Sequence, residues 1–173
     1  MRYFIMKQDH QLPYSFKLRD FEMTGKHQVF YKEEADKLNE VSFLYVLGKG
    51  DEAYADFIQN PVYMVSEVVQ GVLDMYEDDL VFKKVILIHK EAQIQKKYFH
   101  LVTDHIEGLS DKTPFYPDGR EKKLILDYNK IKAHHVFQLK DAKGVYLIVS
   151  LAVVESLLRR KVQGILFEEI EVS

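Results

Sequence analysis

Two stretches of the chain repeat the same order of apolar and polar positions. In each stretch a mostly apolar run, residues 61–66 or 145–150, ends in a serine. Apolar residues then recur at the spacing of one helical face. They are Val68, Val69, Val72, Leu73 and Tyr76 in the first stretch, and Val153, Val154, Leu157 and Leu158 in the second. The pattern predicts a strand followed by an amphipathic helix in both stretches.

A serine and a closing strand complete each repeat. Ser66 and Ser150 occupy the N-cap position, where a hydroxyl can accept a hydrogen bond from a free backbone N–H of the first helical turn. The first helix is expected over residues 66–79, and the second ends at Arg160. The strand patterns that follow are alike in sequence, Phe82-Lys83-Lys84-Val85 and Phe167-Glu168-Glu169-Ile170.

Other apolar runs predict the remaining strands. With the closing strands, they lie at residues 2–7, 41–47, 81–88, 95–102, 120–127, 135–139, 145–149 and 165–172, and a short helix is expected before Asn60. No Pro/Ser-rich linker interrupts the chain, so we expect residues 1–173 to form a single domain. The predicted fold class is α+β, with one mostly antiparallel sheet of about six or seven strands and two principal amphipathic helices packed on it.

Composition narrows the classes of function. The chain has no cysteine, which excludes disulfides, thiol nucleophiles and thiolate metal sites and fits a reducing cytoplasm. Residues 1–11 do not resemble a secretory signal, and the longest apolar stretch, residues 145–154, is too short to span a membrane. A net charge of −3 argues against a protein that coats nucleic acid. We therefore expect a cytoplasmic protein whose partner is neither nucleic acid nor membrane.

The charge is unevenly distributed along the chain. Residues 50–82 carry eight acidic side chains and no lysine or arginine. Five of them fall on the first predicted helix, and these are Glu67, Asp74, Glu77, Asp78 and Asp79. The last four crowd its C-terminal end, where the helix dipole already presents negative charge. One interpretation is a partner-binding acidic patch that steers a basic protein, such as a nuclease toxin, onto this surface. The other is a solvated helix end.

A loop at residues 113–119 is the second candidate binding element. It contains two adjacent aromatic residues, Phe115 and Tyr116. Aromatic side chains are effective interface anchors because they bury a large area while few torsions are frozen. The alternative is that one of the two rings holds the loop against the core.

No catalytic residue, metal site or cofactor is expected. Asp118, Glu121 and Lys123 imitate the two carboxylates and the lysine of a nuclease superfamily. Only two residues separate the carboxylates, however, which leaves no room for the intervening strand of such a site. His134 and His135 are adjacent, so on a strand they would point to opposite faces and could not easily share a metal ion.

The second repeat carries a resemblance to a known family. Its order of strand, serine, helix, glycine and strand, over residues 135–173, resembles the immunity proteins numbered eleven among bacterial polymorphic toxin systems. The similarity is best over residues 61–173, which include the strand-serine-helix unit at residues 63–73, and it is weaker over residues 1–60, where the first strand is Tyr-rich. Thr103-Asp104 stands where that family has Asn-Pro, which leaves a sister immunity family with the same fold as an alternative.

The resemblance implies a partner and no reaction, because such families are thought to bind and neutralise a toxin encoded beside them. The leading hypothesis is a non-catalytic cytoplasmic immunity protein that inhibits its cognate toxin by binding it. The alternatives are a small metal-dependent hydrolase or nuclease, and a stand-alone protein-interaction module.

Overall fold

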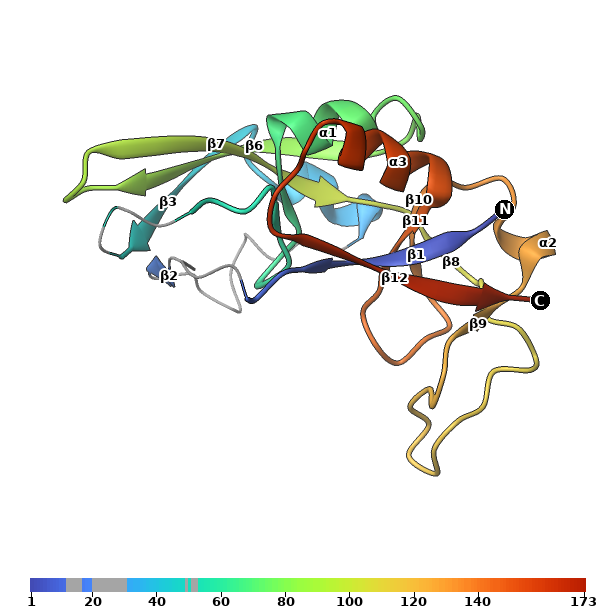
Figure 1. The fold of residues 1–173 in the computed structure, drawn as a ribbon. Coiled ribbons are helices and arrows are strands. Elements are labelled where there is room, and N and C mark those ends of the chain that lie inside the picture. Colours follow the sequence, from blue (N-terminus) through green and yellow to red (C-terminus); the bar gives the residue numbers. More distant parts are fainter. Residues whose placement is uncertain (12–16, 20–30, 49, 51–52) are drawn as a thin grey trace.

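The strands form two six-stranded sheets instead of the single sheet that the sequence predicts (Figure 1). The computed structural model describes residues 1–11, 17–19, 31–48, 50 and 53–173. In spatial order, the first sheet contains β8 His105–Ile106, β10 Val136–Leu139, β11 Leu147–Ser150, β1 Tyr3–Gln8, β12 Ile165–Val172 and β9 Ile125–Leu126. The second contains β2 Lys17–Arg19, β3 Val41–Leu47, β6 Val81–His89, β7 Ile94–Val102, β5 Met64–Ser66 and β4 Phe57–Ile58.

Three α-helices and one 3₁₀ helix accompany the sheets in the described part of the chain. They are α1 Glu67–Leu73, α2 Tyr128–Ile131, α3 Leu151–Arg159 and the 3₁₀ helix η1 Lys32–Lys37. Most strand pairs are antiparallel, and the exceptions among the described strands are β3 with β6, β8 with β10, and β9 with β12. The predicted α+β class and the mostly antiparallel pairing are therefore confirmed.

The sequence repeat is also a repeat of topology. In the second sheet, β7 lies between β5 and β6 and is antiparallel to both, and α1 connects the two outer strands. In the first sheet, β1 lies between β11 and β12 in the same way, and α3 connects them. Each repeat is a split β-α-β unit, in which a helix joins two parallel strands that have a third strand between them.

The match extends to the neighbouring strands. On one side of each unit a parallel strand is added, β3 beside β6 and β9 beside β12. On the other side an antiparallel strand is added, β4 beside β5 and β10 beside β11. The repeats differ in the origin of the middle strand, because β7 directly follows β6 whereas β1 comes from the N-terminal end of the chain.

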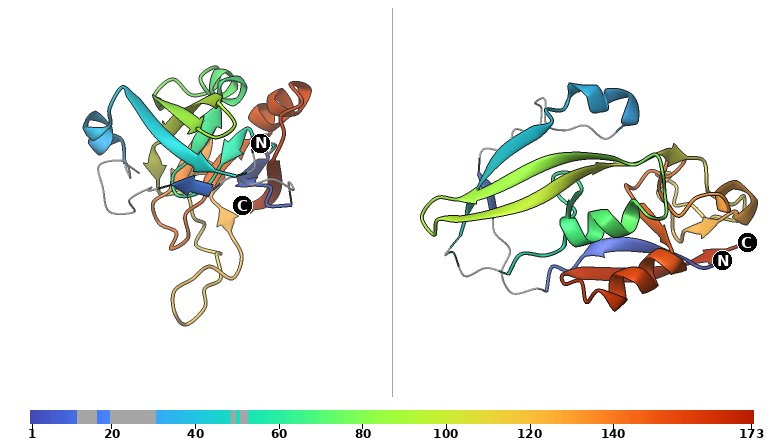
Figure 2. Two further views of the ribbon diagram at one scale, coloured as in Figure 1. Left: turned by 90° about the vertical axis from the view of Figure 1, so that its left-hand side faces the viewer. Right: turned by 90° about the horizontal axis from the view of Figure 1, so that it is seen from above.

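The two long helices lie side by side over a core that both sheets share (Figure 2). Val69 and Val72 of α1 meet Val153 and Leu157 of α3 in the largest buried cluster, which also takes residues from β1, β5, β7, β10 and β11. A second cluster fills the other face of the first sheet, and a third fills the other face of the second sheet. Both sheets therefore depend on the same pair of helices.

The helix termini differ in part from the prediction. Helix α1 ends at Leu73 and does not extend to residue 79. The Ser66 hydroxyl accepts a hydrogen bond from the N–H of Val69 at 3.4 Å, as an N-cap should. Ser150 occupies the N-cap position before α3, but its hydroxyl makes no cap hydrogen bond and lies 2.8 Å from Nδ1 of His135. The hydroxyl that was expected to cap the helix thus interacts with His135, the residue before β10.

Two further expectations are corrected by the structure. The strand predicted at residues 120–127 is reduced to β9, because residues 111–124 form a loop. The short helix expected before Asn60 is not found in residues 53–60, which contain β4, and residues 51–52 lie outside the described residues. Helix α2 was not predicted; it begins at the N-cap Asp127, whose carboxylate accepts a hydrogen bond from the N–H of Asn129 at 2.9 Å.

Candidate functional site

The acidic residues predicted on the first helix occupy three different environments. Glu67 begins α1 and forms an ion pair with Lys97 of β7. Asp74 is the C-cap of the helix, and Asp78 and Asp79 follow in the connection to β6, with all three side chains exposed. We call Asp74, Asp78 and Asp79 the acidic corner. Because the helix ends at Leu73, only Asp74 directly faces the negative end of the helix dipole.

Glu77 is separate from the acidic corner, because its carboxylate points into the molecule. One of its oxygens accepts hydrogen bonds from the backbone N–H groups of His135, at 2.6 Å, and Val136, at 3.2 Å. The other lies 3.3 Å from Nδ1 of His134. The Glu77 side chain is only 13% exposed. Its hydrogen bonds join the turn after α1 to the start of β10. This arrangement indicates a stabilising role.

Phe115 and Tyr116 lie on a loop, residues 111–124, that projects from the first sheet on the side away from α1 and α3 (Figures 1 and 2). Their side chains are 46% and 48% exposed, so neither ring is held in the core as the alternative interpretation required. Exposed aromatic rings on a projecting loop are available to anchor a partner.

Hydrogen bonds close the tip of this loop. The N–H of Tyr116 donates to the carbonyl of Arg120 at 2.8 Å, and the N–H of Gly119 donates to the carbonyl of Tyr116 at 2.9 Å. Gly119 adopts a φ of +82°, a conformation that favours glycine. Two cations lie near the Tyr116 ring, with the Arg120 guanidinium at 5.8 Å and the Lys122 ammonium at 5.3 Å from its centre. The tip therefore presents a positioned aromatic ring beside positive charge.

The residues that imitate a nuclease motif hold the loop in place. Asp118 accepts hydrogen bonds from the N–H and the guanidinium of Arg120. Glu121 accepts from the N–H of Lys143 and the hydroxyl of Tyr146. Burial raises the pKa of the Glu121 carboxyl, but hydrogen bonds, that of Lys143 foremost, outweigh it and keep the pKa below its usual value. Both carboxylates thus have hydrogen-bond partners, Asp118 within the loop and Glu121 in the neighbouring residues 143–146.

The candidate binding elements do not form one continuous site. Helix α1 and the turn after it lie at the top of Figure 1, whereas the loop with Phe115 and Tyr116 is at the bottom. A partner that contacts both would have to reach around the first sheet. The structure thus places the two binding elements predicted from the sequence, the acidic helix end and the aromatic loop, on separate surfaces.

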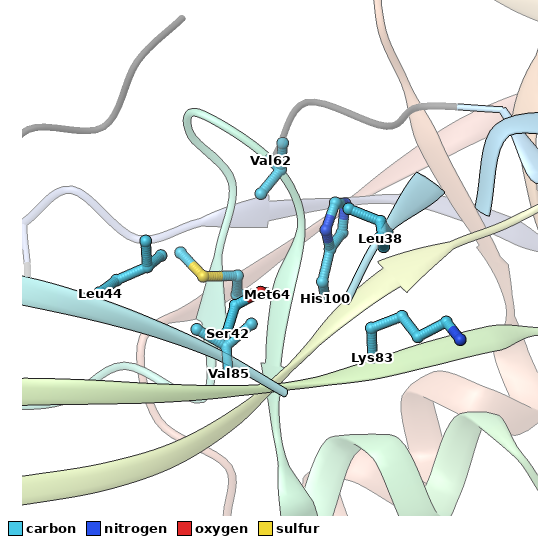
Figure 3. Close-up of a pocket in the computed structure, with 8 residues that line it drawn as sticks. All are labelled: Leu38, Ser42, Leu44, Val62, Met64, Lys83, Val85 and His100. Atoms are coloured by element: carbon cyan, nitrogen blue, oxygen red, sulfur yellow. The ribbon is translucent and has the colours of Figure 1, made fainter. Parts of the chain in front are cut away.

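The structure offers little space for a small ligand near His100, one of two buried histidines on the second sheet. His100 is only 4% exposed, and its ring lies beside Leu38 in a hollow between β3, β5 and β6 (Figure 3). The hollow is about 10 Å³, room for no more than a single water molecule. Within the described ranges, no three histidine, aspartate or glutamate side chains gather in a way that could hold a metal ion.

Sequence reasoning missed an apolar surface on the second sheet. Val41, Phe43, Tyr45 and Leu47 alternate along β3 and are all exposed. Neighbouring β6 adds Ile86 and Ile88, which are half-buried, to the same face. We call these six residues the β3–β6 strip. The available signal was a run with apolar residues at both odd and even positions, but that pattern is equally typical of a strand buried on both faces.

Comparison with known protein families gives a match to the immunity protein family Imm11 over residues 6–172. The chain belongs to the Imm11 immunity protein family. The match confirms the resemblance seen in the sequence, and it covers most of both topological repeats as well as the projecting loop. A comparison with curated proteins finds no match. None of the helices in the described part of the chain has the length and apolar character needed to cross a bilayer.

Proposed function

We propose that this protein is a non-catalytic, cytoplasmic immunity protein that binds a cognate bacterial toxin domain and neutralises it. The observation that carries the proposal is the Imm11 match over nearly the whole chain. The loop that exposes Phe115 and Tyr116 adds a physical means of recognition, because anchored aromatic rings contribute strongly to binding interfaces. We also infer that residues 1–173 act as one domain, since the largest core draws on both sheets.

Co-expression with the toxin encoded beside this gene tests the proposal. We expect cells that produce both proteins to survive, and we expect the two chains to purify as a complex. The control is the toxin expressed alone, which should arrest growth. Toxicity that persists in the presence of the soluble protein, with no complex formed, would contradict the proposed function.

We expect replacement of both Phe115 and Tyr116 by alanine to weaken toxin binding by roughly 30-fold or more, the loss of about 2 kcal/mol typical of a binding hot spot. The measurement is titration calorimetry of the purified pair. Because both rings are half exposed, the thermal unfolding of the variant should match that of the wild type. The control is Leu158→Ala on α3, where the replaced side chain is 58% exposed. If both variants bound the toxin as tightly as the wild type, the loop would not be part of the interface.

We further propose that the acidic corner attracts a basic region of the toxin. Reversal of Asp74, Asp78 and Asp79 to lysine should slow association and weaken its dependence on salt, because exposed charges act mainly on the rate of encounter. Glu77 is left unchanged because its carboxylate is bound to backbone N–H groups. Stopped-flow association at several salt concentrations is the measurement.

A triple reversal elsewhere on the surface controls for net charge. Asp36, Glu107 and Glu155 are exposed acidic residues outside both the acidic corner and the projecting loop. If both triple variants slow association equally, overall charge and not the acidic corner determines the rate.

A further inference from the structure

One face of the second sheet continues past α1 without cover from the described residues. Helix α1 packs over the part of this face that contains Val65 and Leu101. The β6–β7 hairpin and β3 extend beyond the helix, to the left in Figure 1. In this extension the side chains of the β3–β6 strip remain exposed, with Phe43 reaching 62%. The face is therefore buried at one end and open at the other.

The pairing of β3 with β6 gathers the exposed residues into one surface. Phe43 lies opposite Ile86, and Tyr45 lies opposite Ile88. Paired residues of neighbouring strands project to the same side of a sheet, so these four side chains are contiguous. Leu47 extends the row along β3.

Stability of the sheet does not explain why this face is apolar. The opposite face has its own core, in which Val46, Val85, Leu87 and Tyr98 are at most 4% exposed. An antiparallel or mixed sheet needs only one buried face, and the other usually alternates to polar residues. Here the open face carries four apolar side chains in succession on β3. Contiguous apolar surface of this kind is characteristic of interaction sites.

Positive charge borders the β3–β6 strip. Lys84 pairs with Val41 in the register of the two strands and is exposed. The Lys90 ammonium lies 4.4 Å from the centre of the Tyr45 ring. Lys97 stands opposite Ile86, although its charge is already paired with Glu67. A partner that covers the strip must therefore place groups next to Lys84 and Lys90 that tolerate or neutralise a cation.

We propose that the β3–β6 strip is a docking surface for the cognate toxin, and that the toxin meets it with apolar side chains bordered by carboxylates. The inference rests on the proposed function. Its chemistry follows from the apolar centre, which gains free energy when water is excluded, and from the lysines at the margin, which favour acidic neighbours. The arrangement of apolar core and charged rim is that of a protein interface.

Phe43→Asp tests the apolar centre of the surface. The substitution places a carboxylate where the proposal requires apolar contact, and we expect the dissociation constant for the toxin to rise about 10-fold or more. Leu166→Asp is the matched control, because Leu166 is a strand residue of the first sheet that is 50% exposed. The proposal is overturned if both variants bind as tightly as the wild type or are weakened equally.

Lys84→Glu combined with Lys90→Glu tests the margin. We expect association with the toxin to slow by about 10-fold at low salt and the difference to shrink as salt is added, since the rim charges act through electrostatic steering. Lys140→Glu, at an exposed lysine after β10, is the control. Faster association of the double variant would indicate a basic partner surface and would overturn the proposed chemistry.

Two further measurements separate other occupants of the strip from the toxin. A wild type that sediments as a dimer and a Phe43→Asp variant that sediments as a monomer would assign the strip to a second copy of this chain. A loss of unfolding stability in Phe43→Asp as large as that of a core substitution would assign it to another segment of the same chain. Either result overturns the inference.

The outcome for the wild type distinguishes this inference from the proposed function. A wild type that neither binds nor neutralises the toxin refutes both. A wild type that protects cells, together with a Phe43→Asp variant that binds equally well, refutes only the assignment of the strip.

Discussion

Replacement of Phe137 by alanine is expected to lower the free energy of unfolding by about 3–5 kcal/mol. Phe137 has no exposed surface and belongs to the second cluster, on the face of the first sheet opposite α1 and α3. Its ring packs edge-on against Tyr3 of β1 at a centroid distance of 6.0 Å. Removal of the ring leaves a cavity where β1, β10 and α2 meet. Urea unfolding followed by circular dichroism measures the loss.

Phe115→Ala is the matched control, because it deletes the same ring from a site that is 46% exposed. We expect its unfolding free energy to change by no more than about 0.5 kcal/mol. A loss of several kcal/mol in Phe115→Ala would mean that the projecting loop is part of the core. A small loss in Phe137→Ala would contradict the assigned packing of the second cluster.

Replacement of Glu77 by alanine should lower the free energy of unfolding by about 2–3 kcal/mol. The loss would set Glu77 apart from the exposed acidic residues beside it in the sequence. Its carboxylate accepts hydrogen bonds from the N–H groups of His135 and Val136, and Val136 is fully buried. A buried N–H that loses a charged acceptor pays the cost of its desolvation. The unfolding free energy in urea is again the measurement.

Two further variants serve as comparisons for Glu77→Ala. Asp78→Ala removes a neighbouring exposed carboxylate, and we expect it to be neutral within about 0.5 kcal/mol. Glu77→Gln retains one acceptor oxygen and should lose less stability than Glu77→Ala. If Glu77→Ala and Asp78→Ala were equally mild, the link from α1 to β10 would not contribute to stability.

Local patterns predicted the repeated elements well, for reasons seen in particular residues. Val69 and Val72 face the core from α1 as Val153 and Leu157 do from α3, because helical periodicity reports which face is buried. The hairpin of β6 and β7 follows from two adjacent apolar runs joined by a short polar turn. The division into two sheets was not predictable, since it depends on β1 pairing with strands that are distant in sequence.

The candidate site was predicted less completely than the fold. Exposure of Phe115 and Tyr116 could not be read from the sequence, because an aromatic ring in a loop suits either the core or the surface. Glu77 could not be told from Asp78, because the distinction arises only where the turn after α1 meets β10. Phe43 is exposed because α1 does not reach the part of the sheet where it lies. The position of a helix on a sheet cannot be read from the local sequence pattern.

The position of β1 has a consequence for the order in which the protein folds. Strand β1 completes the second repeat, yet its partners β11 and β12 follow all strands of the first repeat in the sequence. The first repeat, from β3 to β7, is contiguous in sequence, so its strands pair without closing a loop as long as the one between β1 and β11. We expect the second sheet, and the β3–β6 strip with it, to assemble first during translation. In the emerging chain, β1 would then stay unpaired until β11 and β12 have left the ribosome.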